Sequence, residues 1–258
     1  MNLLTPTTTT TTRDPQISPT GPTTTAELPE EVREVNARLV DKHAAELYDA
    51  PAHTILRWAR EHVPGATAVT LSMENTVLAE LAAWHLPSAD LLFLDTGYHF
   101  PETLAVAEQV AARYPQTLVT ARPTLTRGEQ DATYGANLYR NNPTACCRMR
   151  KVEPLAVHLS PYAGWVTGLR RADGPTRAQA PALSLDATGR LKISPLVTWS
   201  IADTERFIDE RDLIIHPLTR QGYPSIGCAT CTLPVADGED PRAGRWAGND
   251  KTECGLHS

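Results

Sequence analysis

The sequence predicts an α/β fold built on a doubly wound, mostly parallel sheet, with a mobile C-terminal tail. Short apolar segments alternate with amphipathic segments of about 10–15 residues, which is the pattern of parallel βαβ units. Polar residues gather directly after the expected strands, where such sheets bind ligands. From Leu213 onward Pro, Gly and Cys dominate, and residues 234–258 lack any periodicity. We therefore expect residues 1–27 to be a disordered tail, 28–233 a nucleotide-binding domain, and 234–258 the mobile tail.

The first half of the chain begins the alternation after two helices. Residues 1–27 are rich in Thr and Pro and poor in apolar side chains, so they cannot form a core. Apolar residues at helical spacing then predict helices over 29–48 and 51–63. The segments that follow predict a strand at 68–71, a helix at 74–85, a strand at 90–94, a helix at 101–113 that Pro101 opens, and a strand at 117–120.

The second half adds a capped helix, further strands and a last helix. Asn142-Pro143 predicts a helix start, which places Cys146 and Cys147 in its opening turns. Pro154 should kink or end this helix near Glu153. The remaining elements are expected to be a strand at 165–168, a hairpin of 182–187 and 190–194 around Thr188-Gly189, and a helix at 202–211.

The five cysteines are two close pairs and a single residue: Cys146-Cys147, Cys228-x-x-Cys231 and Cys254. The odd count, and the absence of a basic and apolar leader at the N-terminus, argue against a disulfide framework. The CxxC pair suits structural zinc, whereas adjacent cysteines suit the separate corners of an iron–sulfur cubane. Buried inert thiols are a third alternative. Spacing alone leaves the metal open.

Composition excludes some function classes. The chain has 258 residues with net charge −6, so it offers no global basic field for nucleic acid. No apolar run approaches the length of a membrane span, and the free thiols point to the cytoplasm. Cations nevertheless gather locally: Arg148, Arg150 and Lys151 follow the first cysteine pair, and Arg170, Arg171, Arg177, Arg242 and Arg245 come later. These cations predict a small anionic ligand. The oligomeric state stays open, a homo-oligomer included.

Several motifs together resemble the assimilatory adenylylsulfate (APS) reductases, the iron–sulfur branch of the APS/PAPS reductase family. The motifs are CCRMRKVEPL from Cys146, GCATCT from Gly227, PRAGRW from Pro241, ECGLH from Glu253, and the segments LDTG from Leu94 and PET from Pro101. The resemblance covers about residues 30–258. It implies an adenine nucleotide alpha-hydrolase-like fold. One departure lies at Leu71–Asn75, where related nucleotide loops carry glycine; Ser72 keeps a hydroxyl at the strand end.

The resemblance implies a role for each group. Cys146, Cys147, Cys228 and Cys231 become ligands of a [4Fe–4S] cluster, and Cys254 becomes the nucleophile that attacks the sulfur of APS. An S-sulfocysteine would form, and thioredoxin or glutaredoxin would release sulfite from it. The substrate-binding candidates are Ser72, Lys151, Arg170 or Arg171, Arg242, Arg245 and His257.

Three rival functions remain. The same reaction on 3′-phosphoadenylylsulfate (PAPS), alone or alongside APS, is the nearest. An adenylyl transferase would need no C-terminal cysteine. A non-catalytic iron–sulfur sensor would use the cluster for regulation and the tail as a passive appendage. DNA-binding sensors usually show a basic helix, and none is obvious.

Overall fold

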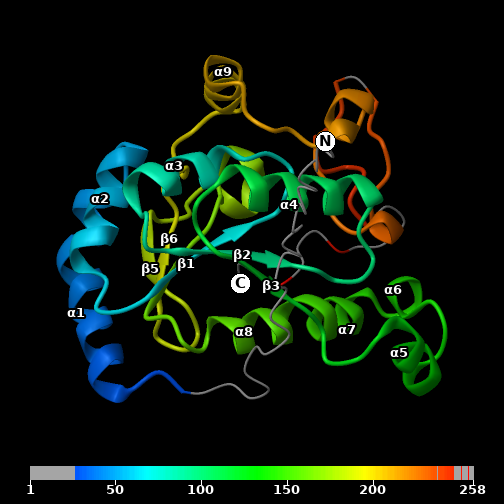
Figure 1. The fold of residues 1–258 in the computed structure, drawn as a ribbon, viewed down its shortest axis with the longest axis horizontal. Helices are drawn as coiled ribbons and strands as arrows, with labels where there is room; N and C mark the ends of the chain where they lie inside the picture. Colours follow the sequence, from blue (N-terminus) through cyan, green and yellow to red (C-terminus); the bar gives the residue numbers. More distant parts are fainter. Residues whose placement is uncertain (1–26, 237, 247–250, 252–254, 256–258) are drawn as a thin grey trace, which may run out of the picture.

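A six-stranded sheet forms the centre of the computed structural model, which describes residues 27–236, 238–246, 251 and 255 (Figure 1). The strands lie in the order β3-β2-β1-β4-β6-β5. Neighbours are parallel except β5 and β6, which form an antiparallel hairpin. The strand bounds are β1 (Thr67–Leu71), β2 (Asp90–Leu94), β3 (Leu118–Ala121), β4 (Gly164–Val166), β5 (Leu183–Leu185) and β6 (Leu191–Ile193). The predicted α/β fold with a mostly parallel sheet is confirmed.

Helices cover both faces of this sheet, as a doubly wound fold requires (Figure 1). Adjacent strand residues point to opposite faces: Val69 belongs to the core shared with α2, α3 and α4, whereas Ala68 belongs to the core shared with α8. The strand order reverses between β1 and β4. Ligands bind at such a switch point, at the carboxyl ends of the strands.

Most predicted helices form close to their expected bounds. They are α1 (Glu30–Leu47), α2 (Ala52–His62), α3 (Val77–His85), α4 (Pro101–Arg113) and α9 (Ile201–Arg211). Helix α3 starts at Val77 and not at Glu74, because the Asn75 side chain accepts the Val77 N–H (3.2 Å). The Thr76 N–H also donates to the Ile214 carbonyl (3.0 Å), which ties the preceding turn to a distant segment.

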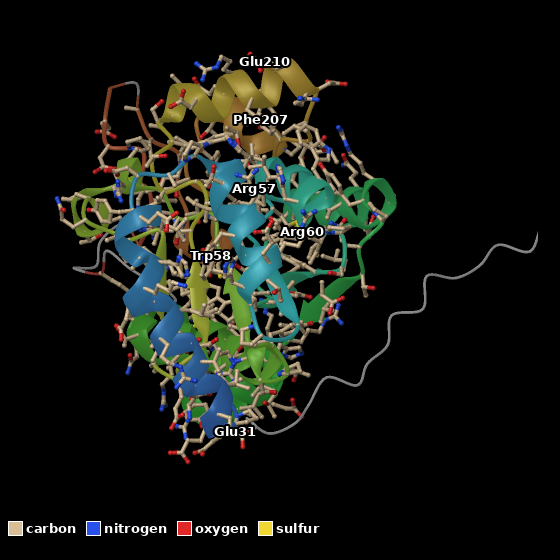
Figure 2. The ribbon with its side chains drawn as sticks, turned by 90° about the vertical axis from the view of Figure 1, so that its left-hand side faces the viewer. Glu31, Arg57, Trp58, Arg60, Phe207 and Glu210 are labelled. Carbon is tan, nitrogen blue, oxygen red and sulfur yellow. The ribbon has the colours of Figure 1, made fainter. Side chains whose placement is uncertain are left out.

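Helices α1 and α2 lie side by side at one edge of the sheet. Figure 2 shows this side, with Trp58 on α2, and with Phe207 and Glu210 on α9 above. The Asn36 side chain of α1 is fully buried and donates to the carbonyl oxygens of Ala163 (3.0 Å) and Gly189 (2.9 Å). This polar anchor fixes α1 against the turn of the hairpin.

Two short helices were not predicted, α5 (Arg127–Tyr134) and α6 (Leu138–Asn141). Helix α5 is mostly exposed, so it shows no apolar periodicity. It starts with a capping box in which Thr126 Oγ1 accepts the Glu129 N–H (3.2 Å) and Glu129 accepts the Thr126 N–H (2.8 Å). Thr-x-x-Glu is the one sequence signal that could have predicted it.

The chain from Pro143 to Leu159 stays helical through the predicted break. Helix α7 (Pro143–Cys147) passes into a π-helical turn, η1 (Arg148–Val152), and then into α8 (Glu153–Leu159). The Glu153 N–H donates to the Arg148 carbonyl, five residues back. Of the predicted kink or end at Pro154, the end is wrong, because the chain stays helical to Leu159, and the kink stays a prediction. The wider turn changes the i−4 geometry in which the proline ring would clash with the Arg150 carbonyl.

The described part of the C-terminal segment folds back onto the residues that precede it. Thr232 and Arg245 form an isolated antiparallel bridge, and the Trp246 N–H donates to the Cys231 carbonyl (3.0 Å). Trp246 is only 3% exposed. The boundary at residue 234 stays a prediction, although residues on its two sides pair with each other. Within the described residues, no helix combines the length and apolarity that crossing a bilayer would require.

Candidate functional site

A cavity of about 740 Å³ lies at the carboxyl ends of β1, β2 and β4. Its wall contains Ser72 and Glu74 after β1, Thr96 after β2, and Gly168 and Arg170 after β4. The cavity therefore lies at the switch point where the strand-end segments predicted it. Its volume falls in the range that holds a nucleotide-sized ligand.

Cations line much of this cavity, and they are Lys151, Arg170, Arg177, Arg242 and Arg245. Guanidinium carbons of Arg242 and Arg245 lie 5.9 Å and 4.8 Å from the centre of the Trp246 ring. Arg245 Nη1 donates to Ser225 Oγ (3.1 Å), and Lys151 is 8% exposed. Partly buried, oriented guanidinium groups suit a ligand with phosphate or sulfate oxygens.

The two neighbouring arginines after β4 point to different places. Arg170 lines the cavity, where it pairs with Asp173 (2.7 Å). Arg171 does not line it: its guanidinium pairs with Asp49 (2.5 Å) and lies 3.9 Å from the centre of the Tyr48 ring. Of these two candidates, the structure places Arg170 at the cavity and uses Arg171 to hold the end of α1.

Four cysteines from two distant segments line a second, much smaller cavity. Cys146, Cys147 and Cys228 are each 7% exposed, and Cys231 is partly exposed. None of the four forms a disulfide. Two strand-end residues hold the CxxC segment: Thr96 Oγ1 lies 3.3 Å from Cys228 Sγ, and the Ala229 N–H donates to the Tyr98 carbonyl (2.7 Å).

The first cysteine pair is positioned by the predicted helix start. The Asn142 side chain accepts the Ala145 N–H (3.0 Å), and Pro143 occupies the first turn. The predicted cap is thus confirmed. Both cysteines then face the small cavity from α7.

The surroundings of the small cavity oppose ionisation of the Cys146 and Cys231 thiols. Burial raises the pKa of Cys146 to about 12, and the three neighbouring thiols add to the shift, while Arg150 lowers it. Burial also raises the pKa of Cys231, which Lys151 and Arg245 oppose. A cationic centre between the sulfur atoms would favour the thiolate forms of Cys146 and Cys231.

The donor set around this cavity fits a thiolate-bound metal centre. Four thiols on one cavity match the ligands of both a [4Fe–4S] cluster and a Cys₄ zinc ion. As placed, however, no group of three or more His, Cys, Asp or Glu side chains among the described residues could hold a metal ion. The positions of the cysteines therefore do not identify the metal.

The two cavities share part of their walls. Lys151 and Trp246 line both of them. A ligand in the large cavity would thus be separated from the cysteines by these side chains. An anionic ligand in the large cavity and a metal centre held by the four cysteines would both lie near the ammonium group of Lys151.

Two predicted residues, Cys254 and His257, lie outside the described residues. Lys251, three positions before Cys254, is described, and its Nζ donates to Thr144 Oγ1 (3.3 Å) in α7. This contact places the Lys251 side chain beside the helix that carries the first cysteine pair.

Sequence reasoning missed Asp173 and Trp246 as residues of the cavity wall, and it predicted Glu74 and Thr96 only as members of the polar segments after two strands. Glu74 accepts the Ile226 N–H (3.2 Å), and burial raises the pKa of its carboxyl. Its position directly after a strand end was a usable signal. Trp246 was within a quoted motif, but nothing in the sequence indicated that its ring would lie beside two arginines.

Two glycines offer a matched test of Arg245. A Cβ at residue 227 would overlap the Arg245 guanidinium, the movable end of a long side chain. Gly227→Ala should therefore displace the Arg245 guanidinium. We expect kcat/KM for the reduction of APS, the activity that the sequence resemblance implies, to fall by about 10–100-fold, with little change in melting temperature. A Cβ at residue 244 would instead overlap the Leu233 carbonyl, so Gly244→Ala should cost about 1–3 kcal/mol of stability.

The control is Gly128→Ala in α5, where an added Cβ meets no atom within 4 Å. This variant should keep both activity and melting temperature. Wild-type kinetics in Gly227→Ala would show that the observed position of Arg245 is not needed for activity.

Fold and site together define an α/β protein of the adenine nucleotide alpha-hydrolase-like type, with a cationic cavity beside four thiols. A sequence model of the phosphoadenosine phosphosulfate reductase domain matches residues 66–234. The chain belongs to this family. It is 49% identical over 220 residues to the adenosine 5′-phosphosulfate reductase of Mycolicibacterium smegmatis, covering 85% of this chain and 93% of the relative. Identity to the Streptomyces coelicolor adenosine 5′-phosphosulfate reductase is 48%, with the same coverage.

Solved structures agree on the fold. The phosphoadenylyl-sulfate (PAPS) reductase of Candida auris, in a phosphate complex, matches with a TM-score of 0.63 and 27% identity over 81% of this chain and all of that chain. The FMN adenylyltransferase of Candida glabrata, with FAD and pyrophosphate, matches with a TM-score of 0.52 and 16% identity over 86% and 84% of the chains. The second likeness shows a shared fold alone.

Proposed function

We propose that this chain reduces APS to sulfite and AMP in sulfate assimilation, by way of an S-sulfocysteine that thioredoxin or glutaredoxin resolves. The observation that carries the proposal is the shared wall of the two cavities: a nucleotide-sized cationic cavity meets a four-thiol cavity at Lys151 and Trp246. The named relatives, at 48–49% identity, support APS as substrate. Free buried thiols and a dithiol reductant suit the cytoplasm.

In this proposal the phosphosulfate group faces the cations nearest the thiols. Arg242 and Arg245 would bind its oxygens, and Lys151 would lie between it and the cysteines. AMP leaves with developing negative charge on its phosphate, which these donors stabilise. Ser72 and Arg170 would contact the nucleotide from the ends of β1 and β4. Arg171 does not line the cavity, so it is left out of the proposed contacts.

Cys254 is the proposed nucleophile. Its thiolate attacks the sulfur of APS, the bond from sulfur to the bridging oxygen breaks, and AMP departs with the electron pair. A thioredoxin thiolate then attacks Cys254 Sγ and displaces sulfite, and the second thioredoxin thiol returns Cys254 to the thiol and leaves thioredoxin oxidised. Three residues span at most about 11 Å, so the contact of Lys251 with α7 supports access of Cys254 to the cavity wall. His257 would assist in binding or ionising these groups.

Cys146, Cys147, Cys228 and Cys231 would hold a [4Fe–4S] cluster, as expected for the iron–sulfur branch. When bound, such a cluster supplies a compact anionic centre with net charge of about −2, which we assign a structural and electrostatic role. Lys151 and Arg150 line the same cavity and would offset that charge. Thiol exchange at Cys254 carries the reduction itself.

Incubation of the purified protein with APS and reduced thioredoxin tests the proposal. Sulfite and AMP should form in equal amounts, and omitting thioredoxin should leave SO₃ on the Cys254 peptide in mass spectrometry. A higher kcat/KM for PAPS than for APS would favour the alternative substrate, and comparable values a dual-substrate enzyme. Turnover without any adduct on Cys254 would contradict the nucleophile assignment.

A further inference from the structure

A second cationic group in the large cavity is already bridged by a carboxylate. Asp173 Oδ1 lies 2.7 Å from Arg170 Nη2, and Asp173 Oδ2 lies 3.3 Å from Arg177 Nη1. Arg170 Nη1 also donates to Thr204 Oγ1 (2.7 Å). All four side chains line the cavity. The three charged side chains are only 11–17% exposed, so solvent screens their interaction weakly.

This group differs from Arg245, the arginine beside the thiols whose partners are known. Within the described residues, Arg245 has a hydroxyl and an aromatic ring as partners, and no carboxylate within ion-pair distance. Arg170 and Arg177 instead share one carboxylate, which leaves a net charge of about +1 on the three side chains. Glu74 interacts electrostatically with both groups. Burial is the main cause of the raised pKa of its carboxyl, and the charges of Arg170, Asp173 and Arg245 also affect that pKa.

A second phosphate on the nucleotide would need cations of its own. Such a group carries a charge of about −1.5 to −2 near neutral pH. With Arg242, Arg245 and Lys151 assigned to the phosphosulfate, Arg170 and Arg177 are the remaining arginines of the described cavity wall. Asp173 occupies their donors and repels an arriving phosphate.

We propose that Asp173 is a specificity-determining residue that makes the cavity select nucleotides without a second phosphate, and hence APS over PAPS. This inference rests on the proposed function, because it concerns the same cavity. The side chain that rejects the extra phosphate is Asp173, through its negative charge and its hold on the two arginines.

Asp173→Asn tests the proposal with the smallest change of shape. The amide oxygen can still accept the Arg170 N–H, which Asp173 now accepts at 3.1 Å. Losing the negative charge should free Arg170 and Arg177 for a phosphate. The ratio of kcat/KM for APS to that for PAPS should therefore fall by about ten-fold or more. Calorimetry should show the same change in the affinity for adenosine 3′,5′-bisphosphate relative to AMP.

Glu205→Gln is the matched control. Glu205 also lines the cavity, and its replacement removes the same charge. Among the described residues it bridges no arginines. The substrate ratio should change less than two-fold in this variant. An equal shift in both variants would reduce the effect to general charge and overturn the proposal.

An unchanged ratio in folded Asp173→Asn would also overturn it. Asp173→Ser is the second variant, and failure of both to fold would assign Asp173 a structural role and reject the specificity role. The binding experiment separates this inference from the proposed function. Wild type that binds neither AMP nor the bisphosphate would refute both, whereas wild type that binds AMP with a ratio unaltered by Asp173→Asn would refute the inference alone.

Discussion

Replacing Cys254 with serine is expected to lower the rate of sulfite formation from APS by at least about 10³-fold. A hydroxyl at this position is far less ionised than a thiol and attacks sulfur poorly, so the S-sulfo intermediate cannot form. The loss should appear in kcat, since the arginines proposed to hold the nucleotide are unchanged. Measurements of sulfite release with saturating APS and reduced thioredoxin provide the test.

The same variant has internal controls. Iron content, visible absorption and affinity for AMP should match the wild type, because the proposed cluster ligands are Cys146, Cys147, Cys228 and Cys231, which line the small cavity. Full sulfite formation by Cys254→Ser would reject Cys254 as the nucleophile.

Replacing Cys228 with serine should remove the metal centre as well as the activity. Cys228 is 7% exposed and its sulfur lies 3.3 Å from Thr96 Oγ1, so no solvent ligand can readily take its place. Iron and sulfide should fall from about four of each per chain to less than about one. The melting temperature should drop by about 6–12 °C, which corresponds to about 3 kcal/mol of linked binding free energy.

Elemental analysis of the wild type decides the identity of that centre. About one zinc per chain with no sulfide would show that the four thiols form a Cys₄ zinc site and would reject the cluster.

Together, Cys254→Ser and Cys228→Ser separate two functions of cysteine in this protein. The first variant should lose catalytic activity alone, and the second should lose both catalytic activity and the metal centre.

Patterns of apolar residues were sufficient to predict the buried strands and helices of the fold. The strands at 68–71 and 90–94 are buried on both faces, so their apolar runs are nearly continuous and their neighbours are helical. Helix α5 was missed because most of its side chains face solvent and impose no period. The continuation past Pro154 was also missed, since a π-helical turn leaves no compositional signal.

The candidate site was predictable as a set of residue types and not as an arrangement. The motifs named the cysteines and most cations, and the structure gathers the described ones around two adjoining cavities. Sequence could not choose between Arg170 and Arg171, because the choice depends on their ion-pair partners. Asp49 lies far away in the sequence, and Asp173 follows shortly after both arginines. The bridge made by Asp173 arises only when the loop after β4 folds.

The π-helical turn between α7 and α8 limits which sequence changes this helical segment can tolerate, because it sets the relative orientation of the side chains on its two sides. One extra residue in a turn rotates everything beyond it by about 100° relative to a continuous α-helix. The cysteines before the turn face the small cavity, while Leu155 and Leu159 after it pack into the core under the sheet. One helical segment thus meets two orientation requirements that a uniform helix could not satisfy together. Deleting a single residue from Arg148–Val152 should be tolerated far less than most substitutions there, because it would set the two requirements against each other.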